Sequence, residues 1–124
     1  MDDHKEVEEL EDKIKIALAR LVQLGVHVGN ARQVKEFSTE LRKNALATEV
    51  TRYIQRGESV AASETLGRSS PLYLEKLKQL QKDYADAETT LAEFQIIMTK
   101  LDSYRSMLAM LRETMHAGIA GGGF

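Results

Sequence analysis

Apolar residues recur at alternating steps of three and four along the C-terminal half of the sequence. The members of this stripe are Leu77, Leu80, Tyr84, Ala87, Leu91, Phe94, Met98 and Leu101. Such spacing places them on one narrow face of an α-helix and is typical of helices that pack on other helices. Because a helix cannot bury this stripe against itself, the pattern predicts a packing partner.

The N-terminal part of the chain carries a second stripe with the same spacing. Its members are Val7, Leu10, Ile14, Ala17, Leu21, Leu24, Val28 and Ala31. A step of three residues from Ala31 to Val34 then shifts the register. Gly25 and Gly29 lie within this segment, and each costs about 1 kcal/mol relative to alanine in a helix. We expect a continuous but locally weak helix, in which the glycines either admit another backbone or mark a bend.

The first helix is predicted over about residues 3–56, because Gly57 is a natural C-terminal stop. Residues 57–70 form the one extended break in the pattern. Within this linker, Ser59 is placed to cap a short helix and Gly67 to end it.

The second long helix is predicted over about residues 71–117, since a serine followed by Pro71 marks a helix start. Gly118 is expected to end this helix, so that residues 118–124 form a flexible Gly-rich tail. Residues 1–117 then make a single all-α domain. The predicted architecture is a long antiparallel helical hairpin with a short linker helix and coiled-coil-like packing.

A hairpin of two long helices encloses little core, so assembly into a homo-oligomer is expected. After Leu101 the next stripe positions are Arg105 and Arg112. Either these arginines point into an assembly interior or the register shifts. Uncompensated burial of charge is expensive, so we expect the shift. The shifted stripe is the predicted oligomer interface and consists of Tyr104, Leu108, Leu111 and Met115.

Few residues suggest catalysis or metal binding. There is no cysteine, which excludes disulfides and thiolate ligands. His4, His27 and His116 lie in separate segments, without the spacing of a metal site. The serines cluster at predicted helix boundaries, where capping explains them. We therefore predict no enzymatic activity, no catalytic residue, no metal and no cofactor.

The charge is distributed unevenly, although the formal net charge is only −2. Residues 1–15 carry seven acids and three bases, whereas residues 16–56 carry seven bases and three acids. A basic stripe on the first helix is therefore available for nucleic-acid phosphates. The candidate nucleic-acid-binding residues are Lys35, Arg42, Lys43, Arg52, Tyr53 and Arg56.

Tyr53 lies between Arg52 and Arg56, next to the flexible Gly57. An aromatic ring between guanidinium groups is a usual way to hold single-stranded nucleic acid, because bases stack on the ring while arginines contact phosphates. The alternative is that Tyr53 packs at the end of the helix and the arginines are simply solvated. Binding of the first kind predicts a steep loss of affinity with salt.

One stretch resembles a known family. A basic helix ending in Ala47-Thr48-Glu49-Val50-Thr51-Arg52-Tyr53-Ile54-Gln55-Arg56-Gly57 precedes a Ser-rich linker and a long helix containing Ile96-Ile97-Met98-x-x-Leu101-Asp102. This layout, over roughly residues 40–117, resembles the UvsY family of phage recombination mediators. The resemblance implies a non-enzymatic ring-forming protein that binds single-stranded DNA and helps load a recombinase onto strands covered by single-strand-binding protein. It implies DNA contacts at Arg52, Tyr53 and Arg56, and a turn at Gly57.

Two other functions fit the same sequence. One is a coiled-coil protein-interaction module, such as an adaptor, assembly factor or inhibitor, which suits the negative net charge. The other resembles the small helical subunit of a CRISPR effector complex, which lines a nucleic-acid groove. The acidic N-terminus lacks the layout of a secretion signal, and no apolar run approaches the roughly 20 residues that span a bilayer. We expect a cytoplasmic protein, in a bacterial or phage-infected cell, without a membrane partner.

Overall fold

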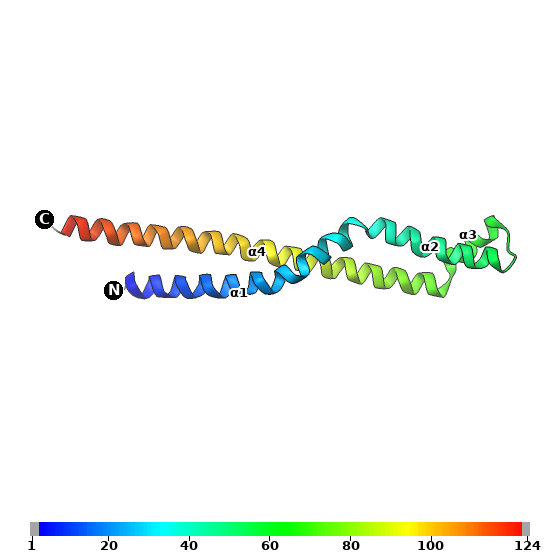
Figure 1. The fold of residues 1–124 in the computed structure, drawn as a ribbon, viewed down its shortest axis with the longest axis horizontal. Coiled ribbons are helices and arrows are strands. Elements are labelled where there is room, and N and C mark those ends of the chain that lie inside the picture. Colours follow the sequence, from blue (N-terminus) through cyan, green and yellow to red (C-terminus); the bar gives the residue numbers. More distant parts are fainter. Residues whose placement is uncertain (1–2, 123–124) are drawn as a thin grey trace. The chain divides into compact units, whose positions relative to one another are not determined.

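The computed structural model describes residues 3–122, and these are helical throughout except at short connections (Figure 1). The helices are α1 (Asp3–Glu36), α2 (Ser38–Gln55), α3 (Val60–Ser69) and α4 (Pro71–Gly122). The all-α prediction is confirmed. The chain forms two compact units. The terminal unit comprises Met1–His27 and Ala92–Phe124, and the central unit comprises Val28–Leu91.

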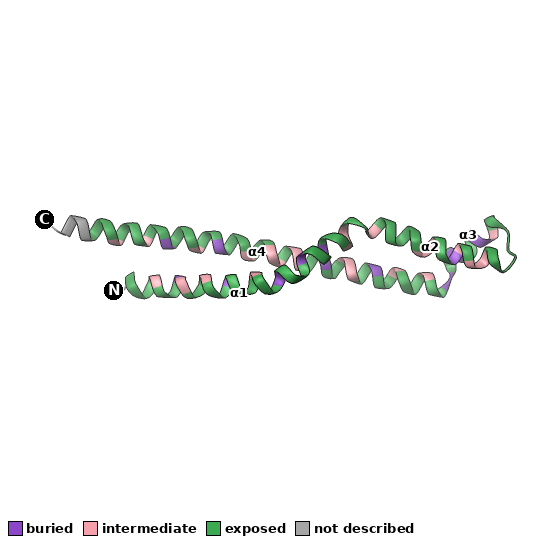
Figure 2. Ribbon diagram, in the orientation of Figure 1, coloured by how far each residue is buried: buried purple, intermediate pink, exposed green. Residues whose placement is uncertain are grey.

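In the terminal unit, the first part of α1 packs antiparallel to the last part of α4. Two ion pairs fix this direction: Arg20 Nη2 lies 2.6 Å from Glu93 Oε1, and Arg112 Nη2 lies 2.9 Å from Glu11 Oε1. The buried side chains follow one side of each helix (Figure 2). They are Leu10, Ala17, Leu24, Leu101 and Leu108. The predicted apolar stripes therefore meet within this unit.

The register of α4 shifts earlier than the sequence suggests. Met98, predicted on the stripe, is 38% exposed, whereas Ile97 is half-buried. From Ile97 onward the alternation of four and three continues through Leu101 and Leu108, and the charged Arg105 is exposed. The predicted shift is confirmed, although it begins before Arg105.

This register changes the role of the predicted oligomer interface. Within the single chain, Leu108 is buried and Tyr104, Leu111 and Met115 are half-buried. They lie on the same α4 stripe as the buried Leu101, which packs on α1. Part of their apolar surface therefore packs within the single chain, and the half-buried members keep some exposed surface.

The predicted first helix over residues 3–56 is interrupted at Phe37, which separates α1 from α2. Phe37 has φ −98° and ψ 8°, yet its N–H still donates to Gln33 O at 2.9 Å and its carbonyl accepts from Leu41 N at 2.9 Å. The interruption follows closely on the short step between Ala31 and Val34, where the apolar stripe changes face. By contrast, α1 continues through both glycines of its predicted weak segment.

The end of α2 is closed by the glycine that the sequence indicates. Gly57 has φ +97°, a left-handed conformation that glycine adopts at little cost. Its N–H donates to Ile54 O at 3.0 Å, and the N–H of Glu58 donates to Tyr53 O at 3.1 Å. This pair of hydrogen bonds is a Schellman motif, which satisfies the last carbonyls of α2.

The linker helix α3 begins as predicted and ends later. Ser59 Oγ accepts from Ala62 N at 3.2 Å, so the N-cap prediction is confirmed. Gly67, however, lies inside α3, which continues to Ser69. A Cβ built on Gly67 would lie 2.9 Å from Cγ2 of Val50 on α2. Gly67 therefore allows α2 and α3 to approach closely rather than ending the helix.

The last helix starts at Pro71 as predicted but continues to Gly122, beyond the predicted end near residue 117. Gly118 lies inside the helix, and Gly57 is the one glycine with positive φ among the described residues. Of the predicted flexible tail, residues 118–122 are helical and residues 123–124 lie outside the described residues. In the described part of the chain, no helix has the length and hydropathy needed to cross a bilayer.

Candidate nucleic-acid interface

Two contacts set the register of the central unit, in which the end of α1 and the whole of α2 run antiparallel to the first part of α4. At one end, Lys35 Nζ lies 5.6 Å from the ring centroid of Tyr84. At the other end, Ser70 Oγ donates to Glu49 Oε2 at 3.0 Å. The helix α3 packs on α2 through the close approach at Gly67.

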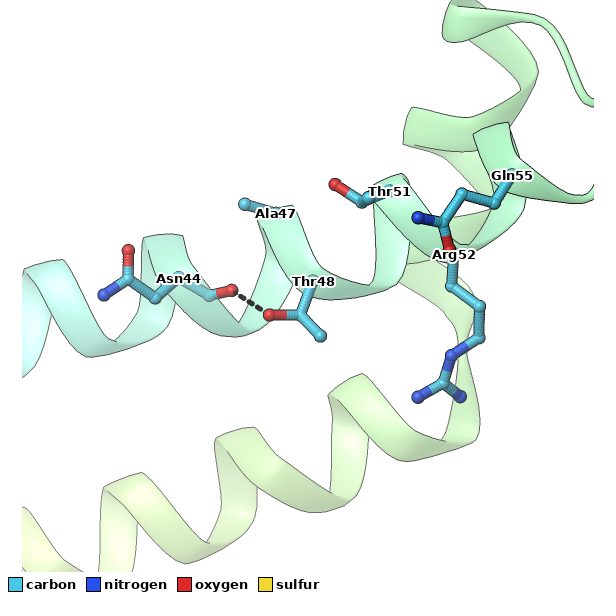
Figure 3. Close-up of a pocket in the computed structure, with 6 residues that line it drawn as sticks. All are labelled: Asn44, Ala47, Thr48, Thr51, Arg52 and Gln55. Atoms are coloured by element: carbon cyan, nitrogen blue, oxygen red, sulfur yellow. Dashed lines mark hydrogen bonds between the residues drawn. The ribbon is translucent and has the colours of Figure 1, made fainter.

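One face of α2 borders an open cavity of about 500 Å³ (Figure 3). Its lining residues are Asn44, Ala47, Thr48, Thr51, Arg52 and Gln55. Steps of three and four residues bring these side chains to one face of the helix. Apart from Arg52, all of them are small or uncharged polar groups. Such a face offers hydroxyl and amide hydrogen-bonding groups to a ligand.

A second cavity of about 410 Å³ lies between α2 and the start of α4. Its lining residues are Leu41, Asn44, Ala45, Thr48, Glu49, Arg52, Leu72, Tyr73 and Lys76. Asn44, Thr48 and Arg52 border both cavities. The two cavities are therefore neighbouring parts of one surface, which we call the α2 groove.

The charges of the α2 groove are two cations and one buried carboxylate. Glu49 is only 5% exposed and accepts a hydrogen bond from Ser70. Its Oε1 also lies 3.4 Å from Arg52 Nη2. Arg52 extends from α2 toward α4 (Figure 3), and its side chain is 41% exposed. Since a guanidinium group has five N–H donors, Arg52 keeps donors for a second anion. Lys76 on α4 is exposed and supplies the other cation.

The structure separates the residues that the sequence grouped as nucleic-acid contacts. Among the six predicted residues, Arg52 lines the α2 groove. Arg42 and Lys43 are exposed on α2, directly before the groove residue Asn44 in the sequence. Lys35 is half-buried beside Tyr84. The predicted residues are thus divided between the end of α1 and the first half and end of α2.

Tyr53 and Arg56 contact each other at the end of α2. The Arg56 guanidinium carbon lies 5.6 Å from the Tyr53 ring centroid, and Tyr53 is half-buried. One face of the ring is therefore covered by an arginine of the same helix. This geometry favours the helix-end packing role for Tyr53 over the base-stacking role.

Several groove residues were not singled out by the sequence. Asn44, Thr48, Thr51 and Gln55 follow a spacing of four, three and four, so a search for uncharged polar stripes would have found them. Tyr73 and Lys76 carry no such signal, because their place beside α2 depends on how the chain turns through α3. The half-buried ring of Tyr73 is the aromatic group of the groove.

The α2 groove combines cations with hydrogen-bonding side chains, which are the groups that contact anionic chains. Arg52 and Lys76 are suited to phosphate oxygens, and the amides and hydroxyls are suited to further hydrogen bonds. Within residues 3–122 the structure contains no group of three or more His, Asp or Glu side chains able to hold a metal ion.

No protein-family model matches this chain, and no curated protein or solved structure matches it either. The function proposed below therefore rests on the geometry and charge of the α2 groove, together with the sequence resemblance.

Proposed function

We propose that this protein is a non-enzymatic accessory protein that binds single-stranded nucleic acid along the α2 groove. The observation that carries the proposal is the pair of neighbouring cavities that share Asn44, Thr48 and Arg52. An elongated surface with cations from two helices suits a flexible, charged strand better than a compact small molecule.

Binding rests mainly on the phosphates. Arg52 and Lys76 contact phosphate oxygens, while Arg42 and Lys43 raise the local positive potential. Asn44 and Thr51 donate hydrogen bonds to the nucleic-acid backbone, the Thr48 hydroxyl oxygen can accept one, and the half-buried ring of Tyr73 supports a base or sugar. None of these contacts selects a particular base, so little sequence preference is expected.

The resemblance to the UvsY family suggests the biological role. A protein of this kind organises single-stranded DNA and helps a recombinase replace single-strand-binding protein. The α2 groove supports the DNA-binding part of that role, whereas the recombinase and the single-strand-binding protein are partners proposed from the resemblance. RNA presents the same phosphate chemistry and is an outcome of the same assay.

Thr48→Glu tests the groove without removing a cation. Thr48 borders both cavities, and its hydroxyl donates only to Asn44 O in its own helix, at 2.9 Å. A carboxylate there repels phosphates, so Thr48→Glu is expected to abolish binding to a labelled oligo-dT at about 50 mM salt. The matched control, Thr39→Glu, adds the same charge to an exposed position on the opposite face of α2 and should still bind. Equal affinity of the two variants, or no binding by the wild-type chain, contradicts the proposal.

A second candidate, a protein-interaction module, is favoured by one specific observation on α1. The sequence has no charged residue between Arg20 and Arg32. Within this stretch, Leu24 is buried, whereas Val22 and Val26 are 74% and 76% exposed on the other side of the helix. A helix that carries large apolar side chains on two sides is typical of a helix with more than one packing partner. If oligo-dT does not bind at low salt, this candidate becomes the preferred function.

A further inference from the structure

The terminal unit has a groove of its own, which the nucleic-acid proposal does not use. A cavity of about 230 Å³ lies along the line where α1 and α4 meet. Its lining residues are Lys13, Ile16, Ala17, Arg20, Ile97, Lys100 and Tyr104. Its apolar residues are bordered by the cations Lys13, Arg20 and Lys100. Arg20 is paired with Glu93, and Lys13 Nζ lies 5.8 Å from the ring centroid of Tyr104. We call this surface the side groove.

The apolar character continues beyond the cavity along α4. Ile96 precedes Lys100 by one turn and is 55% exposed, and Met107 follows Tyr104 by about one turn and is 51% exposed. On α1, Ile16 at the centre of the side groove is 70% exposed. The face thus carries a row of large apolar side chains beside the internal seam. In bundles of helices, each helix packs on two neighbours through two such faces.

The charges along this face change sign near its middle. Residues 3–12 of α1 contain six acids and one lysine, whereas residues 13–27 contain three bases and no acid. Glu9 lies one turn before Lys13, and Asp12 lies one turn before Ile16, so both acids extend the face that lines the side groove. On α4, Lys100 belongs to the basic half. The face is therefore acidic at one end and basic at the other, with the exposed Ile16 within the basic half.

We propose that the side groove is covered by the side groove of a second copy of this chain, related by a two-fold axis with the helices antiparallel. A two-fold contact places the acidic end of each copy against the basic end of the other. Glu9 and Asp12 of one copy then face Lys13 and Lys100 of its partner, and the arrangement occurs twice. Ile16 and Met107 of both copies lie near the axis. A parallel arrangement brings like charges together, so the charge pattern selects the antiparallel pair.

Charge-swapped pairs of variants test this interface in the full-length chain. Lys13→Glu/Lys100→Glu makes both ends of the face acidic, and Glu9→Lys/Asp12→Lys makes both ends basic. All four residues are exposed in the single chain. Multi-angle light scattering at low salt should give a dimer for the wild-type chain and a monomer for each variant alone. An equimolar mixture of the two variants should give a dimer again, because opposite charges then meet at every position.

Three further measurements separate this interface from general effects. Circular dichroism establishes that each variant keeps the wild-type helix content. Lys78→Glu, which reverses an exposed lysine of α4 outside the face, should remain a dimer. Ile16→Gln changes no charge and should weaken the wild-type dimer by about tenfold or more, because it removes apolar contact at the axis. A monomeric wild-type chain, dimeric single variants, or a mixture that stays monomeric overturns the proposal.

Discussion

Replacing Gly67 by alanine should destabilise the protein, although alanine is the better helix former. Gly67 lies inside α3, where the intrinsic preference for alanine is about 1 kcal/mol. The new methyl group, however, would lie 2.9 Å from Val50 Cγ2, 3.4 Å from the Val50 backbone nitrogen and 3.6 Å from Leu46 Cδ1. Overpacking of this kind costs about 1–3 kcal/mol, because the branched side chain of Val50 has little rotamer freedom. The net effect is a loss of about 0–2 kcal/mol.

Gly25→Ala is the matched control, because a Cβ at that α1 position meets nothing within 4 Å. It should stabilise the chain by about 1 kcal/mol, so the two variants differ by about 1–3 kcal/mol. Urea unfolding, followed by circular dichroism at one protein concentration, measures the difference. With a slope of about 1–3 kcal/mol per molar urea, the midpoints separate clearly.

A double-mutant cycle with Val50→Ala identifies the cause. Once Cγ2 is absent, Gly67→Ala should become neutral or stabilising, which gives a coupling energy of about 1–3 kcal/mol. If Gly67→Ala raises the urea midpoint as much as Gly25→Ala does, α2 and α3 do not approach as closely as described. A coupling energy near zero leads to the same conclusion.

Three other substitutions probe the central unit by the same unfolding assay. Ser63 is fully buried and its hydroxyl lacks a hydrogen-bond partner among the described residues, so Ser63→Ala should stabilise the chain by about 1 kcal/mol; any loss of stability contradicts the burial. Ser70→Ala removes the donor to the buried Glu49 and should lower the free energy of unfolding by about 1.5–3 kcal/mol. Its neighbour Ser69 is exposed and forms hydrogen bonds only within α3, so Ser69→Ala should have little effect. Equal effects of the two substitutions refute the role of the Ser70 hydrogen bond. Gly57→Ala should cost about 1–2 kcal/mol because of its left-handed backbone, and an unchanged midpoint refutes that conformation.

Much of the fold can be predicted from local sequence patterns that extend over a few residues. The alternation of three and four residues predicts the buried side of α1 and most of that of α4, because helix geometry alone decides which residues share a face. The stops and starts at Gly57, Ser59 and Pro71 are also local, since they depend on backbone conformations and side-chain caps. These features agree with the structure.

The features that were wrong depend on contacts between segments. The sequence around Gly67 resembles a helix end, and only the packing of α2 against Gly67 shows its actual role. Likewise, Ile97 takes the half-buried position that the sequence predicted for Met98, and this depends on the partner helix. The break at Phe37 similarly needs the change of face between the two stripes. A local pattern contains no information on which neighbour a residue meets.

The candidate site was predicted only in part for the same reason. The basic composition of residues 16–56 is visible in the sequence, and Arg52, one of the predicted contacts, lines the α2 groove. Two contacts could not be predicted because they depend on side-chain packing. They are the contact of Arg56 with Tyr53 and that of Arg52 with the buried Glu49. Tyr73 and Lys76 join the groove through the turn made by α3.

The salt dependence of oligo-dT binding tests the central claim most directly. Fluorescence anisotropy of a labelled oligo-dT gives the binding constant at a series of salt concentrations. The logarithm of this constant falls linearly with the logarithm of the salt concentration, with a slope of about 0.7 per phosphate contact for single strands. Lys76→Gln, which removes a groove cation, should lower this slope by about 0.7. Lys78→Gln, an equally exposed lysine on the same helix that does not line either cavity, should leave it unchanged. Identical slopes for the two variants, or an affinity that does not depend on salt, contradict a nucleic-acid-binding α2 groove.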